Sequence, residues 1–171
     1  MLPPELQEKV EAMLAGVDQR RELAVDVMYT LQKHYGYLSD EALEEGARLL
    51  GLTPLELEEI ATFYDFIYRE PVGRFVIHVC DGVVCWMCHA GWEACPTESI
   101  MDYLCRKLEV QVGETTADGL FTVLPVCCLG YCDHAPAMLV NGVLYGPLTP
   151  EKIDEILHQL STESCEVVIC R

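Results

Sequence analysis

Four cysteines arranged in two pairs constrain this chain more than any other feature of its sequence. Cys80 and Cys85 form the first pair, in the segment VCDGVVC, and Cys128 and Cys132 form the second, in CCLGYCDHAP. Each pair lies where a segment typical of a β-strand gives way to a loop. Four thiolates could therefore converge on one cofactor.

Composition excludes several classes of protein. The chain has 171 residues, enough for one ordinary domain or two small ones, and a formal charge of −17 that would repel nucleic acid and anionic lipid. No apolar run approaches the roughly 18 residues of a membrane span, and the N-terminus does not resemble a signal peptide. We therefore expect a cytoplasmic protein without direct membrane insertion. Its ten cysteines then favour metal or redox chemistry over disulfides.

The first 68 residues are predicted to form consecutive helices. Gly36 and Gly51 are expected to end two of them, Ser39 to cap a third, and Thr53-Pro54-Leu55-Glu56 matches a capping box. The apolar residues with helical spacing, which we expect in a core, are Leu6, Val10, Met13 and Leu14; Ala24, Met28, Leu31 and Tyr35; Leu43, Ala47 and Leu50; and Leu57, Ile60, Ala61 and Tyr64.

The pattern changes at Pro71-Val72-Gly73, where we expect a domain boundary. The predicted elements that follow are a strand over 75–79 with Cys80 at its end, a loop to about Pro96, a helix over 97–109, a strand over 120–126, a hairpin over 138–145 that turns at Asn141-Gly142, and a helix from Thr149 to about Leu160. This order resembles the thioredoxin fold. We therefore predict an α+β protein with a helical domain (1–70), a thioredoxin-like domain with a mixed sheet (71–160) and a tail (161–171).

Spacing alone leaves the cofactor and its ligands open. Soft thiolate ligands suit zinc or an iron–sulfur cluster, and the wide loops within both pairs favour a [2Fe–2S] cluster over a zinc knuckle. Cys88 is a rival ligand, because Cys80-x4-Cys85-x2-Cys88 matches the start of a plant-type ferredoxin motif, and Cys85-x2-Cys88 is also a thioredoxin-type redox motif. Cys127 is a rival of Cys128, since neighbours on a strand point to opposite faces.

The cysteine segments and their surroundings resemble a known family. CDGVVC, GETTADGLFTVLPVCCLGYCDHAP, the closing PLTPE and the earlier segment IATFY are similar to those of the thioredoxin-like [2Fe-2S] subunit of bacterial NADH:quinone oxidoreductase, also called the 24 kDa subunit of complex I. The resemblance covers residues 20–160. It implies that Cys80, Cys85, Cys128 and Cys132 hold one [2Fe-2S] cluster, with Cys88 and Cys127 as non-ligands.

The resemblance also implies partners. In this family, FMN and NADH are bound by a partner flavoprotein subunit, so we expect electron exchange with that flavin and contacts with other subunits of the complex's peripheral arm, at the inner face of the cell membrane. No G-x-G-x-x-G loop is present, which agrees with NADH binding elsewhere. A homologous diaphorase subunit of an NAD-linked hydrogenase or formate dehydrogenase is the close alternative. A thiol–disulfide enzyme, which would need a helix to begin at its motif, and a zinc-stabilised interaction module are alternatives from other classes.

Several residues near the cysteines have less specific interpretations. His78 and His134 are more typical of hydrogen-bonding neighbours of a cluster than of ligands. Asp81 and Asp133 would lower the reduction potential if they faced the cluster, and otherwise cap the surface. The stretch Trp86–Cys95 indicates either packing or a docking loop with a second metal, and the Cys165-x4-Cys170 tail is more typical of a frayed end than of a metal site.

Overall fold

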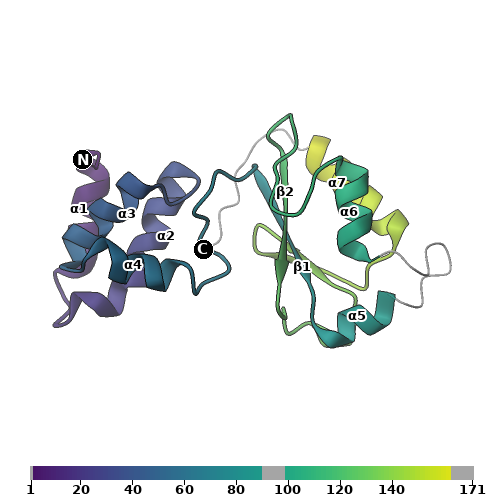
Figure 1. Ribbon diagram of the computed structural model, residues 1–171, viewed down its shortest axis with the longest axis horizontal. Helices are drawn as coiled ribbons and strands as arrows, with labels where there is room; N and C mark the ends of the chain where they lie inside the picture. The colour runs from purple at the N-terminus through teal and green to yellow at the C-terminus, as the bar shows by residue number, and fades with distance from the viewer. Residues whose placement is uncertain (1, 90–98, 163–171) are drawn as a thin grey trace. The chain divides into compact units, whose positions relative to one another are not determined.

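The computed structural model describes residues 2–89 and 99–162, and the chain divides into two compact units after Pro71 (Figure 1). The first unit is helical. Its elements are α1 (Pro4–Leu14), the 3-10 helix η1 (Arg20–Leu23), α2 (Ala24–Tyr35), α3 (Asp40–Leu50) and α4 (Pro54–Ala61). In the described part of the chain, no helix is long and apolar enough to cross a membrane.

Local signals set the ends of these helices. The Ser39 hydroxyl accepts a hydrogen bond from the Ala42 N–H at 3.2 Å and so caps α3. Thr53 and Glu56 form the predicted capping box, in which the Glu56 carboxylate accepts the Thr53 N–H at 2.9 Å. Gly36 and Gly51 end their helices with φ of 85° and 72°, a left-handed conformation that glycine adopts without strain. All four predicted helix ends are confirmed.

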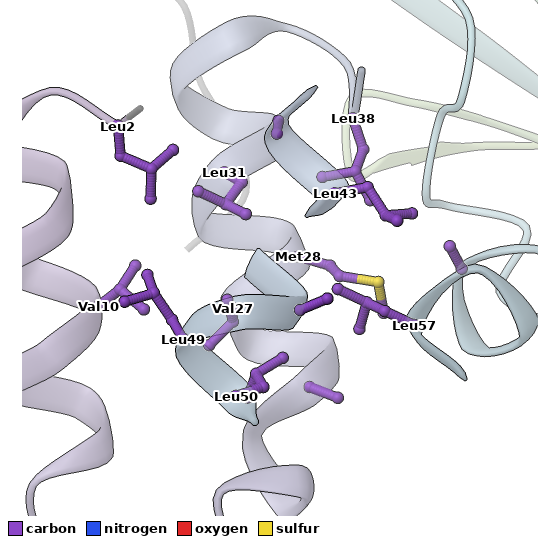
Figure 2. Packing of buried hydrophobic residues seen from close by; sticks show 14 of the residues in the cluster. Leu2, Val10, Val27, Met28, Leu31, Leu38, Leu43, Leu49, Leu50 and Leu57 are labelled. Carbon is purple, nitrogen blue, oxygen red and sulfur yellow. The ribbon is translucent and has the colours of Figure 1, made fainter. Parts of the chain in front are cut away.

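The apolar stripes of the four helices pack into one core (Figure 2). Leu31 and Leu57 are fully buried in this core and stabilise it by about 1.5–3 kcal/mol each. Two predicted core residues lie elsewhere: Tyr35 is 39% exposed and Tyr64 is 40% exposed. Tyr64 lies beyond the end of α4 at Ala61, so the helical spacing that placed it on the stripe does not continue to its position.

The second unit is a mixed sheet with helices. Its elements are β1 (Phe75–Cys80), α5 (Val83–His89), α6 (Ile100–Leu108), β2 (Phe121–Val126), the 3-10 helix η2 (Cys132–His134), β3 (Met138–Val140), β4 (Val143–Tyr145) and α7 (Pro150–Thr162). The strand order is β2-β1-β3-β4, with β1 parallel to β2 and antiparallel to β3. The predicted α+β class with a mixed sheet is confirmed.

The central strand β1 is buried along its whole length. Ile77 from β1 and Val123 from β2 pack in one cluster with Leu104 of α6 and Ile153 of α7, and these helices lie side by side against the sheet (Figure 1). The burial of successive residues on both faces explains why the β1 sequence is a continuous apolar run and does not alternate. β1 therefore ends at a fixed position, with Cys80 as its last residue.

The predicted turn of the hairpin is confirmed. Asn141 and Gly142 have φ of 44° and 87°, as a type I′ turn requires. The Asn141 side chain also accepts a hydrogen bond from the Val76 N–H at 3.0 Å and donates one to the Arg74 carbonyl at 2.8 Å. These bonds tie the turn to the start of β1.

Two predictions about the segment after Cys80 are wrong. The sequence predicts a loop up to Pro96, but α5 occupies Val83–His89. It predicts the next helix from residue 97, but that helix begins at Ile100, where Ser99 and Asp102 form a capping box. A helix therefore does begin near Cys85, contrary to expectation, and Cys85 lies in its first turn.

Candidate metal centre

The parallel pairing of β1 with β2 brings the two cysteine pairs together. In this register Cys80 lies beside Val126, and the Asp81 N–H donates to the Val126 carbonyl at 2.9 Å. Because parallel strands end at the same edge of a sheet, the loops that follow them leave from neighbouring points. The first loop leads to Cys85 and the second begins with Cys127-Cys128.

The four predicted thiols interact with one another. Cys80 is hydrogen-bonded to Cys85 and to Cys128, and Cys128 is hydrogen-bonded to Cys132. The first pair is buried and the second pair is exposed. The structure thus gathers four sulfur atoms from two loops at one edge of the sheet, partly in the core and partly at the surface.

Backbone N–H groups are directed at the buried pair. Burial opposes ionisation of Cys80, but the N–H groups of Leu129 and Gly82 donate to its sulfur, and the pKa of Cys80 is lowered overall. The N–H of Ala137 donates to Cys85. Such donors stabilise a thiolate without a cationic side chain.

The remaining thiols hold their protons more tightly. Burial and the hydrogen bond with Cys80 raise the pKa of Cys85 to about 11. The hydrogen bond with Cys128 and its charge raise the pKa of Cys132, and Cys128 itself accepts the Gly130 N–H at 3.4 Å. Without a bound cation, the first negative charge in the group therefore suppresses the others, whereas a metal would deprotonate all four.

Two glycines let the cysteine loops approach their neighbours. An ideal Cβ on Gly82 would lie 3.2 Å from the Cys127 carbonyl oxygen and 3.5 Å from the Cys80 sulfur. An ideal Cβ on Gly146 would overlap the carbonyl oxygen of His134 and lie 3.3 Å from its carbonyl carbon. Sequence reasoning identified Gly82 but missed Gly146, which lies far from both motifs.

The donor set fits an iron–sulfur cluster. Soft thiolates, two from each of two loops, match the ligand demand of a [2Fe–2S] cluster, and N–H groups directed at sulfur are the hydrogen-bond donors that tune such clusters. Among the described residues, no three His, Cys, Asp or Glu side chains converge as they would on a single metal ion.

Comparison with known proteins agrees with this donor set. Residues 10–161 match the family model described as thioredoxin-like [2Fe-2S] ferredoxin. The chain belongs to this ferredoxin family. The family covers both units of the chain, since the match begins in α1 and ends in α7.

Curated relatives of this ferredoxin share one name, that of the NADH-quinone oxidoreductase subunit designated E. The protein from Escherichia coli (strain K12) is 38% identical over 153 residues, which cover 90% of this chain and 88% of the relative. The protein from Buchnera aphidicola subsp. Baizongia pistaciae is 40% identical over 154 residues, which cover 89% and 86%. The protein from Pseudomonas aeruginosa is 36% identical over 148 residues, which cover 86% and 85%.

Solved structures give a second kind of relative. The crystal structure of an NAD+-reducing [NiFe]-hydrogenase in the H2-reduced state contains a chain that is 31% identical, with a TM-score of 0.64. The match covers 81% of this ferredoxin but only 22% of the hydrogenase chain, so that chain contains much more than this fold.

The rival cysteines lie outside the group of four. Cys88 on α5 and Cys127 after β2 are both exposed. Within the described part of this ferredoxin, the thiols that shift the pKa values of Cys80 and Cys132 belong to the group of four. Cys95 and the tail with Cys165 and Cys170 lie outside the described residues, as does most of the predicted docking loop.

The neighbouring histidines and acids have structural partners. His78 is buried in β1 at 2% exposure. The ring of His134 stacks on Tyr131, with centroids 4.4 Å apart, and its Nδ1 lies 3.0 Å from the Asp133 carboxylate. The Asp133 side chain is 76% exposed, so water screens its charge, and Asp81 is also exposed.

Proposed function

We propose that this ferredoxin is a one-electron carrier that holds one [2Fe–2S] cluster on Cys80, Cys85, Cys128 and Cys132. The observation that carries the proposal is the mutual hydrogen bonding of these four thiols at the shared end of β1 and β2. When bound, the cluster supplies one-electron redox chemistry at iron. The chain's own groups hold the sulfurs and direct N–H dipoles at them.

The natural partner in this proposal is a flavoprotein. The relatives named as a subunit of NADH-quinone oxidoreductase support a place in an NADH-oxidising complex, where a separate subunit would bind NADH and FMN. In this view residues 1–70 form a helical domain that contacts neighbouring subunits of the peripheral arm, residues 71–160 carry the cluster, and residues 161–171 form a tail. The complex, and not this chain, would provide attachment to the inner face of the membrane.

Cysteine substitution tests the ligand set. Separate Cys→Ala variants at Cys80, Cys85, Cys128 and Cys132 are expected to lose the rhombic EPR signal of the dithionite-reduced protein and its visible absorption. The matched controls, Cys88→Ala and Cys127→Ala, are expected to keep both. Loss of the signal in the Cys88 variant with retention in the Cys128 variant would overturn the assignment.

Metal and activity measurements on the purified chain separate the proposal from other classes of function. About two irons and two sulfides per chain are expected, as in a [2Fe–2S] cluster, whereas a zinc module would contain neither. The pKa of about 11 for Cys85 disfavours a thiol–disulfide enzyme, because such a motif needs a readily formed thiolate. We expect no NADH oxidation by the isolated chain, and measured turnover would refute the role of a carrier without its own substrate site.

A diaphorase module is the second candidate function. The likeness to a chain of an NAD+-reducing [NiFe]-hydrogenase favours it specifically. Co-purification from the native organism distinguishes the two parents. Quinone-reducing membrane subunits would support the first candidate, and a hydrogenase or formate dehydrogenase catalytic subunit would support the second.

A further inference from the structure

The outer side of α5 carries a group of exposed apolar side chains, which we call the α5 face. It consists of Val83, Trp86 and Met87, whose exposures are 68%, 59% and 65%. Their i, i+3 and i+4 spacing places them on one side of the helix. Cys85 points to the other side and is 3% exposed. The same short helix therefore fixes a candidate ligand on its inner side and presents apolar surface to solvent on its outer side.

Charge distinguishes the α5 face from the rest of the molecule. The sequence of α5, VVCWMCH, contains no Asp, Glu, Lys or Arg, although the chain has a net charge of −17. Exposed acids stand beside it in the cysteine loops, with Asp81 before α5 and Asp133 after Cys132. An apolar centre with an acidic rim is typical of an interaction surface for a partner with an apolar centre and a basic rim.

The position of the α5 face suits electron transfer. The second cysteine pair is exposed, so the cluster edge held by Cys128 and Cys132 would lie at the surface. Cys85, hydrogen-bonded to Cys80 in the same group of four, belongs to α5 itself. A protein that covers the α5 face therefore approaches the cluster more closely than one that binds the α6 and α7 side of the sheet.

We propose that the α5 face is the docking surface for the flavoprotein partner, through an apolar patch flanked by Lys or Arg on that partner. This inference rests on the proposed function and adds the surface at which the partner binds. A second copy of this chain is a poor occupant, because two acidic rims and two charges of −17 would repel each other.

A charge placed on the α5 face tests the proposal. The double variant Trp86→Glu/Met87→Glu of the full cluster-loaded chain is compared with Val112→Glu, a substitution in the same unit at a valine that is 52% exposed but outside the α5 face. Each protein is titrated with the FMN-loaded flavoprotein subunit of the same organism, and reduction of the cluster by NADH is followed by EPR.

The double variant is expected to bind at least tenfold more weakly, about 1.4 kcal/mol or more, while Val112→Glu stays within twofold of the wild type. High flavoprotein concentration should restore NADH-driven reduction in the double variant. The dissociation constant of the wild type should increase with salt, because the basic and acidic rims attract each other. The EPR signal and the melting temperature of the free double variant should be unchanged.

Three results would overturn the inference and leave the proposed function intact. They are unchanged affinity of the double variant, a lower melting temperature of the free double variant, which would mean that the chain itself covers the face, and dimerisation of the wild type that the double variant abolishes. Failure of the wild type to bind the flavoprotein and to accept electrons from it would instead overturn the proposed function.

Discussion

Replacement of Gly146 by alanine should damage the cluster site from outside both cysteine motifs. Gly146 follows β4, and its Cα faces the carbonyl of His134, which lies two residues after Cys132. The new methyl group would overlap that carbonyl oxygen, which is backbone and cannot rotate away. The segment is also tied from the other side, since the Leu148 N–H donates to the Pro136 carbonyl at 2.9 Å. The added methyl group must therefore displace the Cys132 loop.

The expected magnitude follows from two opposing effects. Overpacking of a tight site costs about 1–3 kcal/mol, while loss of glycine's freedom in the unfolded chain returns about 0.4–1 kcal/mol. We expect a net loss of about 1–2 kcal/mol in the free energy of unfolding of the second unit. Gly16→Ala is the matched control, because no atom lies within 4 Å of the added methyl group and the free energy of unfolding should stay equal or rise slightly.

Urea unfolding of the apo protein measures this difference. The two tryptophans, Trp86 and Trp92, both follow Pro71, so their fluorescence reports on the second unit, and circular dichroism reports on both. Gly146→Ala should also contain less iron per chain, because Cys132 moves. The reasoning is refuted if Gly146→Ala unfolds within about 0.5 kcal/mol of the wild type, the usual range for neutral surface changes, and binds the full complement of iron.

Two further predictions concern stability away from the cluster. Thr53→Ala removes the capping box of α4 and should lower the free energy of unfolding by about 1 kcal/mol, measured by urea unfolding followed by circular dichroism, with Thr53→Ser as the variant that keeps the cap. Lys107→Met removes the Lys107 Nζ to Asp154 carboxylate bond of 2.8 Å, which lowers the pKa of Asp154 below its usual value of 3.8. A lowered pKa stabilises the fold above the unfolded value, so the variant should be about 0.2–1 kcal/mol less stable at pH 6 and equal to the wild type below about pH 3; a difference that persists at acid pH would contradict this.

Short-range signals made the helical unit and the hairpin predictable. Thr53 and Glu56 satisfy backbone groups within one turn of α4, so a few residues of sequence specify the geometry. Asn141 and Gly142 similarly specify a turn with positive φ at both positions. The aromatic residues were harder, because Tyr35 fits a helical stripe by spacing yet keeps its ring at the surface.

α5 was not predictable by the same means. Its seven residues include Val83 and Val84, which favour strands, and the apolar face that normally identifies a surface helix points to solvent. What holds the helix is burial of Cys85 against the end of β1, a contact between the loop and the sheet that local sequence does not encode. The error mattered, since it concealed both the placement of Cys85 and the exposed face.

The electrostatics of the site depend on groups that no motif can specify. The donors to Cys80 and Cys85 are backbone N–H groups of Gly82, Leu129 and Ala137, and every residue except proline carries such a group. Their placement follows from the β1–β2 register and the loop that returns to β3. The first cysteine pair therefore receives dipoles from the backbone in the core, while the exposed second pair relies on Gly130 and water. This division explains how an acidic protein can stabilise buried thiolate charge without a lysine or arginine beside it.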